Sequence, residues 1–245
     1  SAKGVQEDTL AAVQAKCAPG SSVLELGAGN GRLSRMLKDA GYIVVAGDWN
    51  NESFGPTDIV CKKVDCDEPL WLKREFEGQK FDAIVCGDLI EHLRNPFQFL
   101  LSVSELLRKD SSGSGGYLFI TTPNVASPDS RITILVNGNP VSFGTGSESI
   151  GHINPMFPNT MKVAFKCASI KWVASQGIGK VERWVLSEKS FRGLCLRILS
   201  IVFRPMMRKV CSHPVVLFIG QLGSCHQNSS QQPVGTGETG HYSIQ

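Results

Sequence analysis

The chain has 245 residues, of which 42% are hydrophobic and 19% are charged, and its mean hydropathy is close to zero. This composition excludes a disordered, collagen-like or membrane-spanning protein and is typical of soluble globular material. The net charge of +3 is too small to indicate an extended nucleic-acid surface, which needs clustered Lys and Arg on one face.

Short apolar runs alternate with amphipathic stretches along the chain. The predicted strands are residues 23–26, 43–46, 59–64, 81–86, 117–120, 181–186 and 215–219. The stretches with apolar residues three and four apart are predicted helices over 5–17, 32–40, 69–76, 96–108, 160–176 and 191–203. Because each strand-helix-strand unit lays its helix on the sheet, this alternation predicts a doubly wound α/β domain with helices on both faces.

Two irregular segments limit the predicted domain. Residues 137–158 are rich in Gly, Pro, Ser and Asn and are too long for a simple connection, so we predict a lid or a substrate loop there. From Ser224 onward the chain is polar with few apolar residues, which predicts disorder. We therefore expect one domain over residues 1–222 and a disordered tail over residues 223–245.

The eight cysteines are spread over the chain without a CxxC motif, and several lie inside apolar runs. This usage is typical of reduced core thiols and not of a disulfide framework or a zinc site. The chain contains no signal peptide and no run of 18 apolar residues, so we expect a cytoplasmic protein.

The most informative segment is residues 23–32, VLELGAGNGR, a buried strand that runs into three glycines and then into a helix. Glycines let the backbone approach a ligand closely at the carboxyl end of the first strand, where doubly wound sheets place their binding crevice. A dinucleotide-binding turn would read GxGxxG, but the sixth position here is Arg32. Glu25 would also oppose a pyrophosphate, and it suits a ligand with an ammonium group instead.

Two further carboxylates follow the next strands. Asp48 ends the second strand, where it can accept hydrogen bonds from both hydroxyls of a ribose. Asp65 follows the third strand, where it can accept from an adenine amino group. These carboxylates and Glu25 predict a ligand that is a nucleoside bearing an amino acid. The alternative is a tight structural turn with Glu25 and Asp48 solvated at the strand ends.

The chain resembles the class I S-adenosylmethionine-dependent methyltransferases over about residues 20–186. Asp48 and five segments carry the resemblance in the family's order: ELGAGNG, VDCDEPL, FDAIVCGDLIEHL, GYLFITTPN and GHIN. The resemblance implies a Rossmann-like, mostly parallel sheet of seven strands whose last strand is antiparallel. It also implies that S-adenosylmethionine is the cofactor.

The resemblance places the cofactor along the carboxyl ends of the first four strands. The methionine moiety lies near Glu25 and Gly27, the ribose on Asp48, and the adenine near Asp65 and Cys66. Trp49 resembles the side chain that packs on the adenine face, although a Trp at this place can equally be half-buried core. The expected cofactor-binding residues are Glu25, Gly27, Ala28, Gly29, Gly31, Asp48, Trp49, Asp65, Cys66 and Gly87.

A second group of polar residues follows the fourth strand. Asp88, Glu91 and His92 are three and four residues apart and share one face if this segment is helical. Such a set can bind a divalent cation or let His92 act as a general base. Ubiquinone-pathway O-methyltransferases and the enzymes that methylate the terminal 2′-hydroxyl of small RNAs are similar here, with a metal site. In the RNA enzymes a later His completes that site, and His152 matches it.

We expect no metal, and we expect His92, His152, Asp88 and Glu91 to be catalytic. Asp88 is shorter than the usual Glu, and residues 153–156 lack the aromatic and basic residues of the RNA enzymes. In the favoured alternative to a metal, Glu91 and His92 hydrogen-bond helix and loop backbone to shape the pocket. Asn124, after the fifth strand, either orients a substrate or caps the next helix.

The predicted function is methyl transfer from S-adenosylmethionine to a hydroxyl of a small molecule, by in-line attack on the sulfonium methyl. A base or a cation helps a weakly acidic hydroxyl most. The alternatives are metal-dependent terminal 2′-O-methylation of RNA, a non-catalytic S-adenosylmethionine-binding module and a dinucleotide-dependent reductase.

The predicted partner is a small-molecule acceptor. The chain lacks an Asn-Pro-Pro-Tyr motif and a Pro-Cys nucleophile after the fourth strand, so we expect no DNA partner, and nothing in the sequence indicates RNA. Residues 191–209 are basic and amphipathic. They either lie on an acidic membrane surface or form a helix that covers the sheet.

Overall fold

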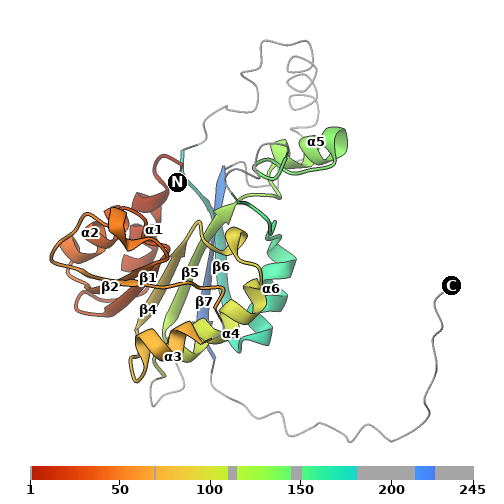
Figure 1. Cartoon of the computed structure of the whole chain (residues 1–245). Helices are drawn as coiled ribbons and strands as arrows, with labels where there is room; N and C mark the ends of the chain where they lie inside the picture. The colour runs from red at the N-terminus through yellow and green to blue at the C-terminus, as the bar shows by residue number, and fades with distance from the viewer. Residues whose placement is uncertain (1, 69, 110–114, 145–150, 181–212, 224–245) are drawn as a thin grey trace, which may run out of the picture.

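The computed structural model describes residues 2–68, 70–109, 115–144, 151–180 and 213–223. Helices cover both faces of one central sheet (Figure 1). The strands are β1 (Ser22–Leu26), β2 (Ile43–Asp48), β3 (Val60–Lys63), β4 (Ala83–Gly87), β5 (Tyr117–Pro123), β6 (Ile170–Ile178) and β7 (Val215–Leu222). The helices are α1 (Val5–Gln14), α2 (Arg32–Asp39), α3 (Trp71–Phe76), α4 (Pro96–Leu106), α5 (Pro128–Asn137) and α6 (Pro158–Cys167), with 3₁₀ turns η1 (Asn51–Ser53) and η2 (Ile90–His92).

The sheet has the order β3-β2-β1-β4-β5-β7-β6. β1 to β5 pair in parallel, whereas β7 runs antiparallel to both of its neighbours. The chain thus moves outward from β1 in one direction and then in the other, so the carboxyl ends of β1 and β4 flank the place where the strand order reverses. Such a switch point is where open α/β sheets bind ligands. The predicted doubly wound sheet with an antiparallel last strand is confirmed.

The core consists of two apolar layers, one on each face of the sheet. Side chains alternate along a strand, so Leu24 and Leu26 point into the layer under α3, α4 and α6, while Val23 points into the layer under α1 and α2. Both faces of β1 are buried, which explains its continuous apolar run. The central strand is therefore held rigidly from both sides, and the turn that follows it starts from a fixed point.

Helix starts follow from short capping signals. The Asn95 side chain accepts a hydrogen bond from the Gln98 N–H at 3.0 Å, and proline follows it at the first position of α4. Ser127 caps α5 in the same way, with a bond from the Ser130 N–H at 3.2 Å. The sequence prediction missed α5. Asn124 does not cap it, because its side chain bonds the Ala126 N–H and the His213 carbonyl instead.

The predicted helix over residues 160–176 is wrong in its second half. Helix α6 ends at Cys167, and Ser169 takes the left-handed conformation with φ of 57°. Strand β6 then pairs with β7 and buries Ile170 and Ile178. β6 thus supplies a strand that the prediction placed at 181–186. That segment, the helix at 191–203 and most of the predicted tail lie outside the described residues.

Three smaller expectations concern the described part of the chain. The described cysteines are all free thiols, as predicted: Cys17, Cys61, Cys66, Cys86 and Cys167. No helix within the described ranges is long and apolar enough to cross a membrane. Of the predicted loop at 137–158, residues 139–144 and 151–157 contain no helix or strand.

We predict that Gly220→Ala destabilises the fold by about 1 to 3 kcal/mol, because overpacking a dense core forces its neighbours apart. Gly220 lies in β7, and a methyl group there would overlap Ile170 and come within 2.8 Å of Phe165. Urea denaturation measures the change in the free energy of unfolding. Gly55→Ala is the matched control, because its methyl group would only touch the Asn30 carbonyl oxygen at 3.5 Å. Equal stability of the two variants would contradict this account of the core.

Candidate functional site

The glycine turn joins the end of β1 to the start of α2. Its glycines 27, 29 and 31 all have positive φ. At Gly31, where φ is 78°, a side chain would also collide with Phe54 and Pro56, so only glycine fits. The Gly27 and Ala28 N–H groups donate to the Gly47 carbonyl of β2, at 2.9 and 3.3 Å. These bonds fix the turn to the end of the neighbouring strand.

The Asp48 carboxylate lies against this turn. One oxygen accepts from the Gly29 N–H at 2.8 Å, and the other accepts from the Asn50 N–H at 2.9 Å. The residue is only 9% exposed. Each carboxylate oxygen can accept a further hydrogen bond, so Asp48 can hold the turn and still bind two ribose hydroxyls.

Glu25 lies in β1, beneath the turn, and is also buried. Its carboxylate accepts a hydrogen bond from the Ser34 hydroxyl of α2. Burial raises the pKa of Glu25 to about 8, with the hydrogen bonds from Ser34 acting against this shift and the nearby charge of Asp48 adding to it. A ligand ammonium group would favour the charged form. Glu25 and Asp48 are both buried. The alternative of a tight structural turn required both carboxylates to be solvated at the strand ends.

Sequence reasoning missed Ser34. The signal for it was a polar residue between Leu33 and Leu37, on the side of α2 that turns toward the sheet. Ser34 is fully buried there. A buried hydroxyl needs a partner, and one turn after the glycines that partner is the Glu25 carboxylate.

The remaining residues of the expected cofactor site follow the ends of β2, β3 and β4. Trp49 is 73% exposed and does not pack in the core. It lines a cavity of about 440 Å³ with Asp65, Arg74 and two other residues. Cys66 lies half-buried after β3, and burial raises the pKa of its thiol. Gly87 ends β4, and its carbonyl oxygen would lie 3.4 Å from a side chain at position 27.

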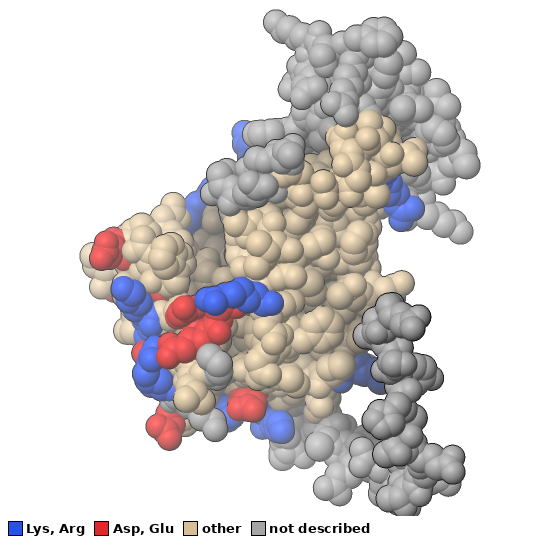
Figure 2. Space-filling model, turned by 45° about the vertical axis from the view of Figure 1, so that its right-hand side comes forward, with Lys and Arg blue, Asp and Glu red and all other residues tan. Residues whose placement is uncertain are grey.

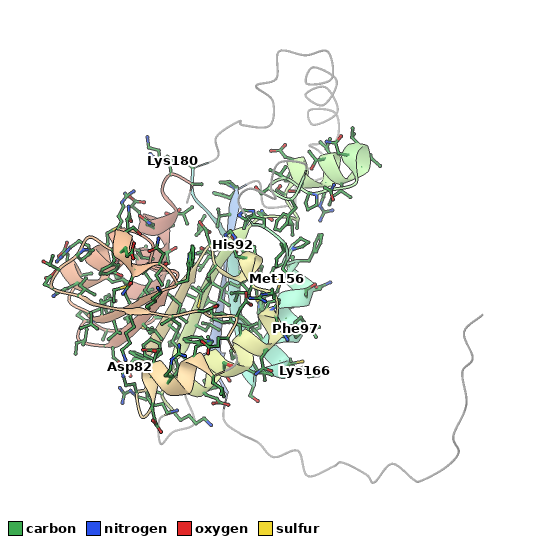
Figure 3. All side chains as sticks on the ribbon, in the orientation of Figure 1. Asp82, His92, Phe97, Met156, Lys166 and Lys180 are labelled. Carbon is green, nitrogen blue, oxygen red and sulfur yellow. The ribbon has the colours of Figure 1, made fainter. Side chains whose placement is uncertain are left out.

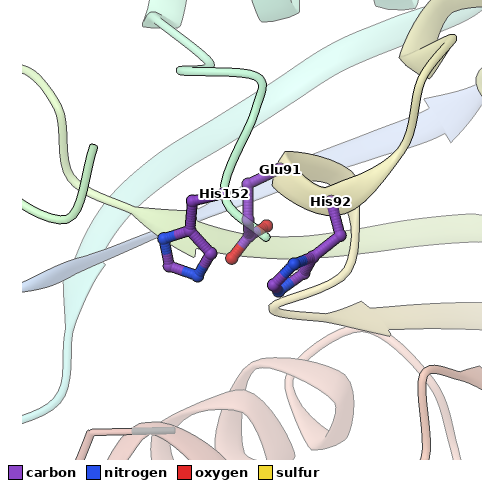
Figure 4. A group of neighbouring side chains, drawn as sticks. All are labelled: Glu91, His92 and His152. Atoms are coloured by element: carbon purple, nitrogen blue, oxygen red, sulfur yellow. The ribbon is translucent and has the colours of Figure 1, made fainter. Parts of the chain in front are cut away.

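A second cluster, formed by Glu91, His92 and His152, lies at the same end of the sheet. Figure 3 places His92 at one end of β4 and Asp82, which precedes the strand, at the other. Figure 4 shows the three side chains of the cluster pointing toward one another, and their ligand atoms lie within 4.8 Å of each other. His152 is distant from Glu91 and His92 in sequence. It lies beside them because the Glu91 carbonyl accepts hydrogen bonds from the N–H groups of Ile153 and Asn154, both at 2.9 Å.

Both histidines of the cluster present a free ring nitrogen. The Nδ1 atom of His92 lies 3.1 Å from the Gly151 carbonyl, and that of His152 lies 3.0 Å from the Ser142 carbonyl. Carbonyl oxygens only accept, so we assign a ring proton to each Nδ1, and in the neutral form of each ring Nε2 then keeps its lone pair. Burial lowers the pKa of His152, which favours this neutral form. Each Nε2 can therefore accept a proton or bind a metal ion.

Glu91 is fully buried, and neither of its carboxylate oxygens has a hydrogen-bond partner among the described residues. Burial, reinforced by the charge of Asp88, raises its pKa to about 8. Leaving a buried carboxylate without a partner is costly unless a ligand supplies one. Two imidazoles and a carboxylate are a ligand set that holds catalytic Zn²⁺ with one position open, so the residues fit a divalent cation. The Glu91 and His92 side chains were both expected to hydrogen-bond the backbone. Among the described residues, only the His92 side chain does so, at the Gly151 carbonyl.

Asp88 is not part of this cluster. Its carboxylate accepts from the Thr121 hydroxyl at 2.9 Å, on the neighbouring strand β5. The segment is helical only at η2, over residues 90–92, so the condition for one helical face of Asp88, Glu91 and His92 is not met. Asp88 itself takes a left-handed conformation, with φ of 46°, which turns the chain away from β4.

Residues 3–168, more than half of the chain, match the family model described as a methyltransferase domain. The chain belongs to this methyltransferase family. The match confirms the resemblance to the class I S-adenosylmethionine-dependent methyltransferases, and with it S-adenosylmethionine as the cofactor.

Curated relatives of this methyltransferase include proteins named ubiquinone biosynthesis O-methyltransferase. The one from Glaesserella parasuis serovar 5 (strain SH0165) is 29% identical over 114 residues, which are 43% of this chain and 46% of that protein. The one from Actinobacillus pleuropneumoniae serotype 7 (strain AP76) is 28% identical over 117 residues, which are 43% of this chain and 47% of that protein. The chain thus spans about half the length of these relatives.

Solved structures confirm the fold of this methyltransferase. A Haloferax volcanii methyltransferase in complex with the Trm112 methyltransferase activator matches with a TM-score of 0.62 and 15% identity, over 91% of this chain and 90% of that one. An S-adenosylmethionine-dependent methyltransferase from Archaeoglobus fulgidus matches with a TM-score of 0.55 and 17% identity, over 88% and 94% of the two chains. At these identities the likeness shows the fold alone.

The raised pKa of Glu25 predicts a pH dependence of stability. The folded state keeps a proton on Glu25 from its ordinary pKa of 4.5 up to about 8, whereas the unfolded chain loses it. The free energy of unfolding therefore falls as pH rises through this window. We expect Glu25→Gln to remove about 1 to 3 kcal/mol of the fall between pH 5 and pH 8.5.

Urea denaturation at several pH values measures this effect. Glu105→Gln, at an exposed position of α4, is the control and should leave the pH dependence as in the unsubstituted chain. Parallel stability curves for Glu25→Gln and the unsubstituted chain would contradict the protonated, buried Glu25.

Proposed function

We propose that this chain transfers the methyl group of S-adenosylmethionine to a hydroxyl of a small molecule, by in-line attack on the sulfonium. One observation carries the proposal: the glycine turn with its two buried carboxylates and the Glu91–His92–His152 cluster lie at the same edge of the sheet. The first group suits a charged nucleoside donor and the second suits the loss of a proton from an acceptor. We propose that the domain extends over residues 1–222, since β7 completes the sheet at Leu222.

In this proposal the donor lies along the ends of β1 to β3. Asp48 accepts the ribose hydroxyls, and Glu25 balances the charge of the methionine ammonium, directly or through water. The adenine lies toward Asp65 and Cys66, with exposed Trp49 closing over it. The turn at residues 27–31, with Gly87 beside it, lets the backbone approach the methionine moiety.

The sulfonium is already activated, so holding acceptor and methyl in attack geometry in a dry cleft supplies most of the rate. The acceptor proton passes to an Nε2 of His92 or His152, the atoms that the backbone carbonyls leave free. In its ionised form, buried Glu91 then stabilises the imidazolium that forms beside it. The name of the curated relatives, O-methyltransferase, supports an oxygen acceptor.

Over its described residues, the face of the molecule shown in Figure 2 lacks the charge pattern of a nucleic-acid surface. Figure 2 shows one face of the molecule, on which charged side chains of both signs gather over one side and the rest is mostly uncharged. The described residues form no extended basic patch on this face. A nucleic-acid partner would need such a patch to neutralise its phosphates.

A second version of the mechanism has a divalent cation, and the unpaired Glu91 carboxylate favours it. Glu91 would hold the ion together with the Nε2 atoms of His92 and His152. A bound divalent cation lowers the pKa of a hydroxyl that coordinates it. In this version the histidines orient the site and do not accept the proton, and their Nδ1–H bonds to the loop carbonyls fix the ring orientations.

We expect Asp48→Ala to weaken the binding of S-adenosylmethionine by about 1 to 3 kcal/mol, because the ribose contacts are lost and the turn is released. Isothermal titration calorimetry measures the dissociation constant. Asp39→Ala, an exposed carboxylate of α2, is the matched control and should bind as the unsubstituted chain does. Unchanged affinity of Asp48→Ala would remove Asp48 from the site.

The function itself is tested by the release of S-adenosylhomocysteine over a panel of phenols, sugars, lipids and RNA. We expect turnover with a hydroxylated small molecule and none with RNA. Turnover only with amines or only with RNA would contradict the proposed acceptor. Binding of S-adenosylmethionine without turnover on any acceptor would indicate a non-catalytic module.

Chelation separates the two versions of the mechanism. If the cation operates, dialysis against a chelator abolishes turnover, added Zn²⁺, Mn²⁺ or Mg²⁺ restores it, and His92→Ala retains no metal by elemental analysis. Full turnover in chelator, with no metal retained by the unsubstituted chain, would reject the cation and leave proton transfer to the histidines.

A further inference from the structure

The junction between β4 and β5 contains a reciprocal pair of hydrogen bonds between Asp88 and Thr121, outside the Glu91–His92–His152 cluster. The Thr121 hydroxyl accepts from the Asp88 N–H at 3.0 Å and donates to the Asp88 carboxylate at 2.9 Å. The Asp88 N–H also lies 3.2 Å from the Thr121 carbonyl oxygen. Thr121 is only 1% exposed, so these bonds form out of water, where losing one is most costly.

This pair acts where the backbone needs support. Asp88 has a φ of 46°. This left-handed conformation is unfavourable for a residue other than glycine, so it persists only where the surrounding structure holds it. The conformation redirects the chain immediately after β4. Without it, β4 would continue along its own direction, and η2 would leave the edge of the sheet. Thr121 is the side chain that bonds both the N–H and the carboxylate of Asp88.

The redirected turn carries both halves of the cluster. Glu91 and His92 lie in η2, and the His92 N–H donates to the Leu89 carbonyl at 3.0 Å, so the turn is closed on itself. The Glu91 carbonyl in turn holds the Ile153 and Asn154 N–H groups, which bring His152 to the site. The position of His152 therefore depends on where the turn after Asp88 points.

We propose that Thr121 is a positioning residue, which through Asp88 holds the turn at residues 88–92 so that Glu91 and His92 meet His152. In this assignment Asp88 supports the cluster from the strand end and does not touch the acceptor. The effect on methyl transfer rests on the proposed function. The effect on the conformation of the turn does not, since it can be measured without an acceptor.

Hydrogen–deuterium exchange with mass spectrometry tests the positioning directly. Thr121→Val keeps the shape of the side chain and removes both hydroxyl bonds. We expect peptides over 88–93 and 151–154 to exchange at least about tenfold faster, because both segments open more often. Thr121→Ser keeps the hydroxyl and should exchange as the unsubstituted chain does.

Thr9→Val is the matched control. Thr9 is equally buried, and its hydroxyl bonds the Val5 carbonyl within α1, in the other layer of the core. Its loss should leave exchange over 88–93 and 151–154 unchanged. Unchanged exchange of these segments in Thr121→Val, or equal acceleration in Thr9→Val, would overturn the proposal. If Thr121→Val does not fold, Asp88→Gly removes the carboxylate without strain and should accelerate the same segments.

Methyl transfer provides the second readout. With the hydroxylated acceptor that the unsubstituted chain turns over best, we expect Thr121→Val to lower kcat by about tenfold or more. The dissociation constant of S-adenosylmethionine should stay within about twofold, since the side chains proposed to bind the donor lie on or just after β1 to β3 and only the Gly87 backbone lies on β4. Equal losses in kcat and donor affinity would indicate a merely structural threonine. If no acceptor is turned over, the proposed function fails, and exchange still decides the role of Thr121.

Discussion

The hydrogen bond from the Gly29 N–H to the Asp48 carboxylate joins the ends of two parallel strands, and the proposed donor side of the site depends on it. Because β1 is packed on both faces, the turn that follows it has a fixed origin. Because Asp48 ends β2, its carboxylate reaches the turn without a flexible loop between them. The turn and the Asp48 carboxylate are therefore held in place before any ligand arrives, which would lower the cost of binding a large nucleoside.

The proposed acceptor side is built differently, by a turn that is bent sharply after β4 and tied to β5. The end of β4 positions Asp88, and the left-handed conformation of Asp88 positions η2. The Glu91 carbonyl of η2 then hydrogen-bonds the loop that carries His152. In the cluster, the backbone satisfies one nitrogen of each imidazole and leaves the other free. Burying Glu91 beside them costs stability, as expected of a site that is organised for chemistry and not for folding.

Local patterns were enough to propose the donor site, because strand, glycines and carboxylates are neighbours in sequence. The α/β class followed from alternation, yet β6 was misplaced, since its residues also fit helical spacing and nothing marked Ser169 as a left-handed helix end. The approach of His152 to Glu91 came only from resemblance, because backbone bonds across the fold produce it. The burial of Glu91 could not be predicted, since it depends on which side chains surround that position. The Ser34 contact was missed, although a polar residue on the apolar side of α2 was its signal.

A crystal structure of the chain with S-adenosylhomocysteine tests the central claim most directly. We predict the ribose hydroxyls on Asp48, the amino group within reach of Glu25 directly or through one water, and the sulfur facing the Glu91–His92–His152 cluster. A nucleoside bound elsewhere, or a crevice at the end of β1 that stays empty at saturating ligand, would contradict the account.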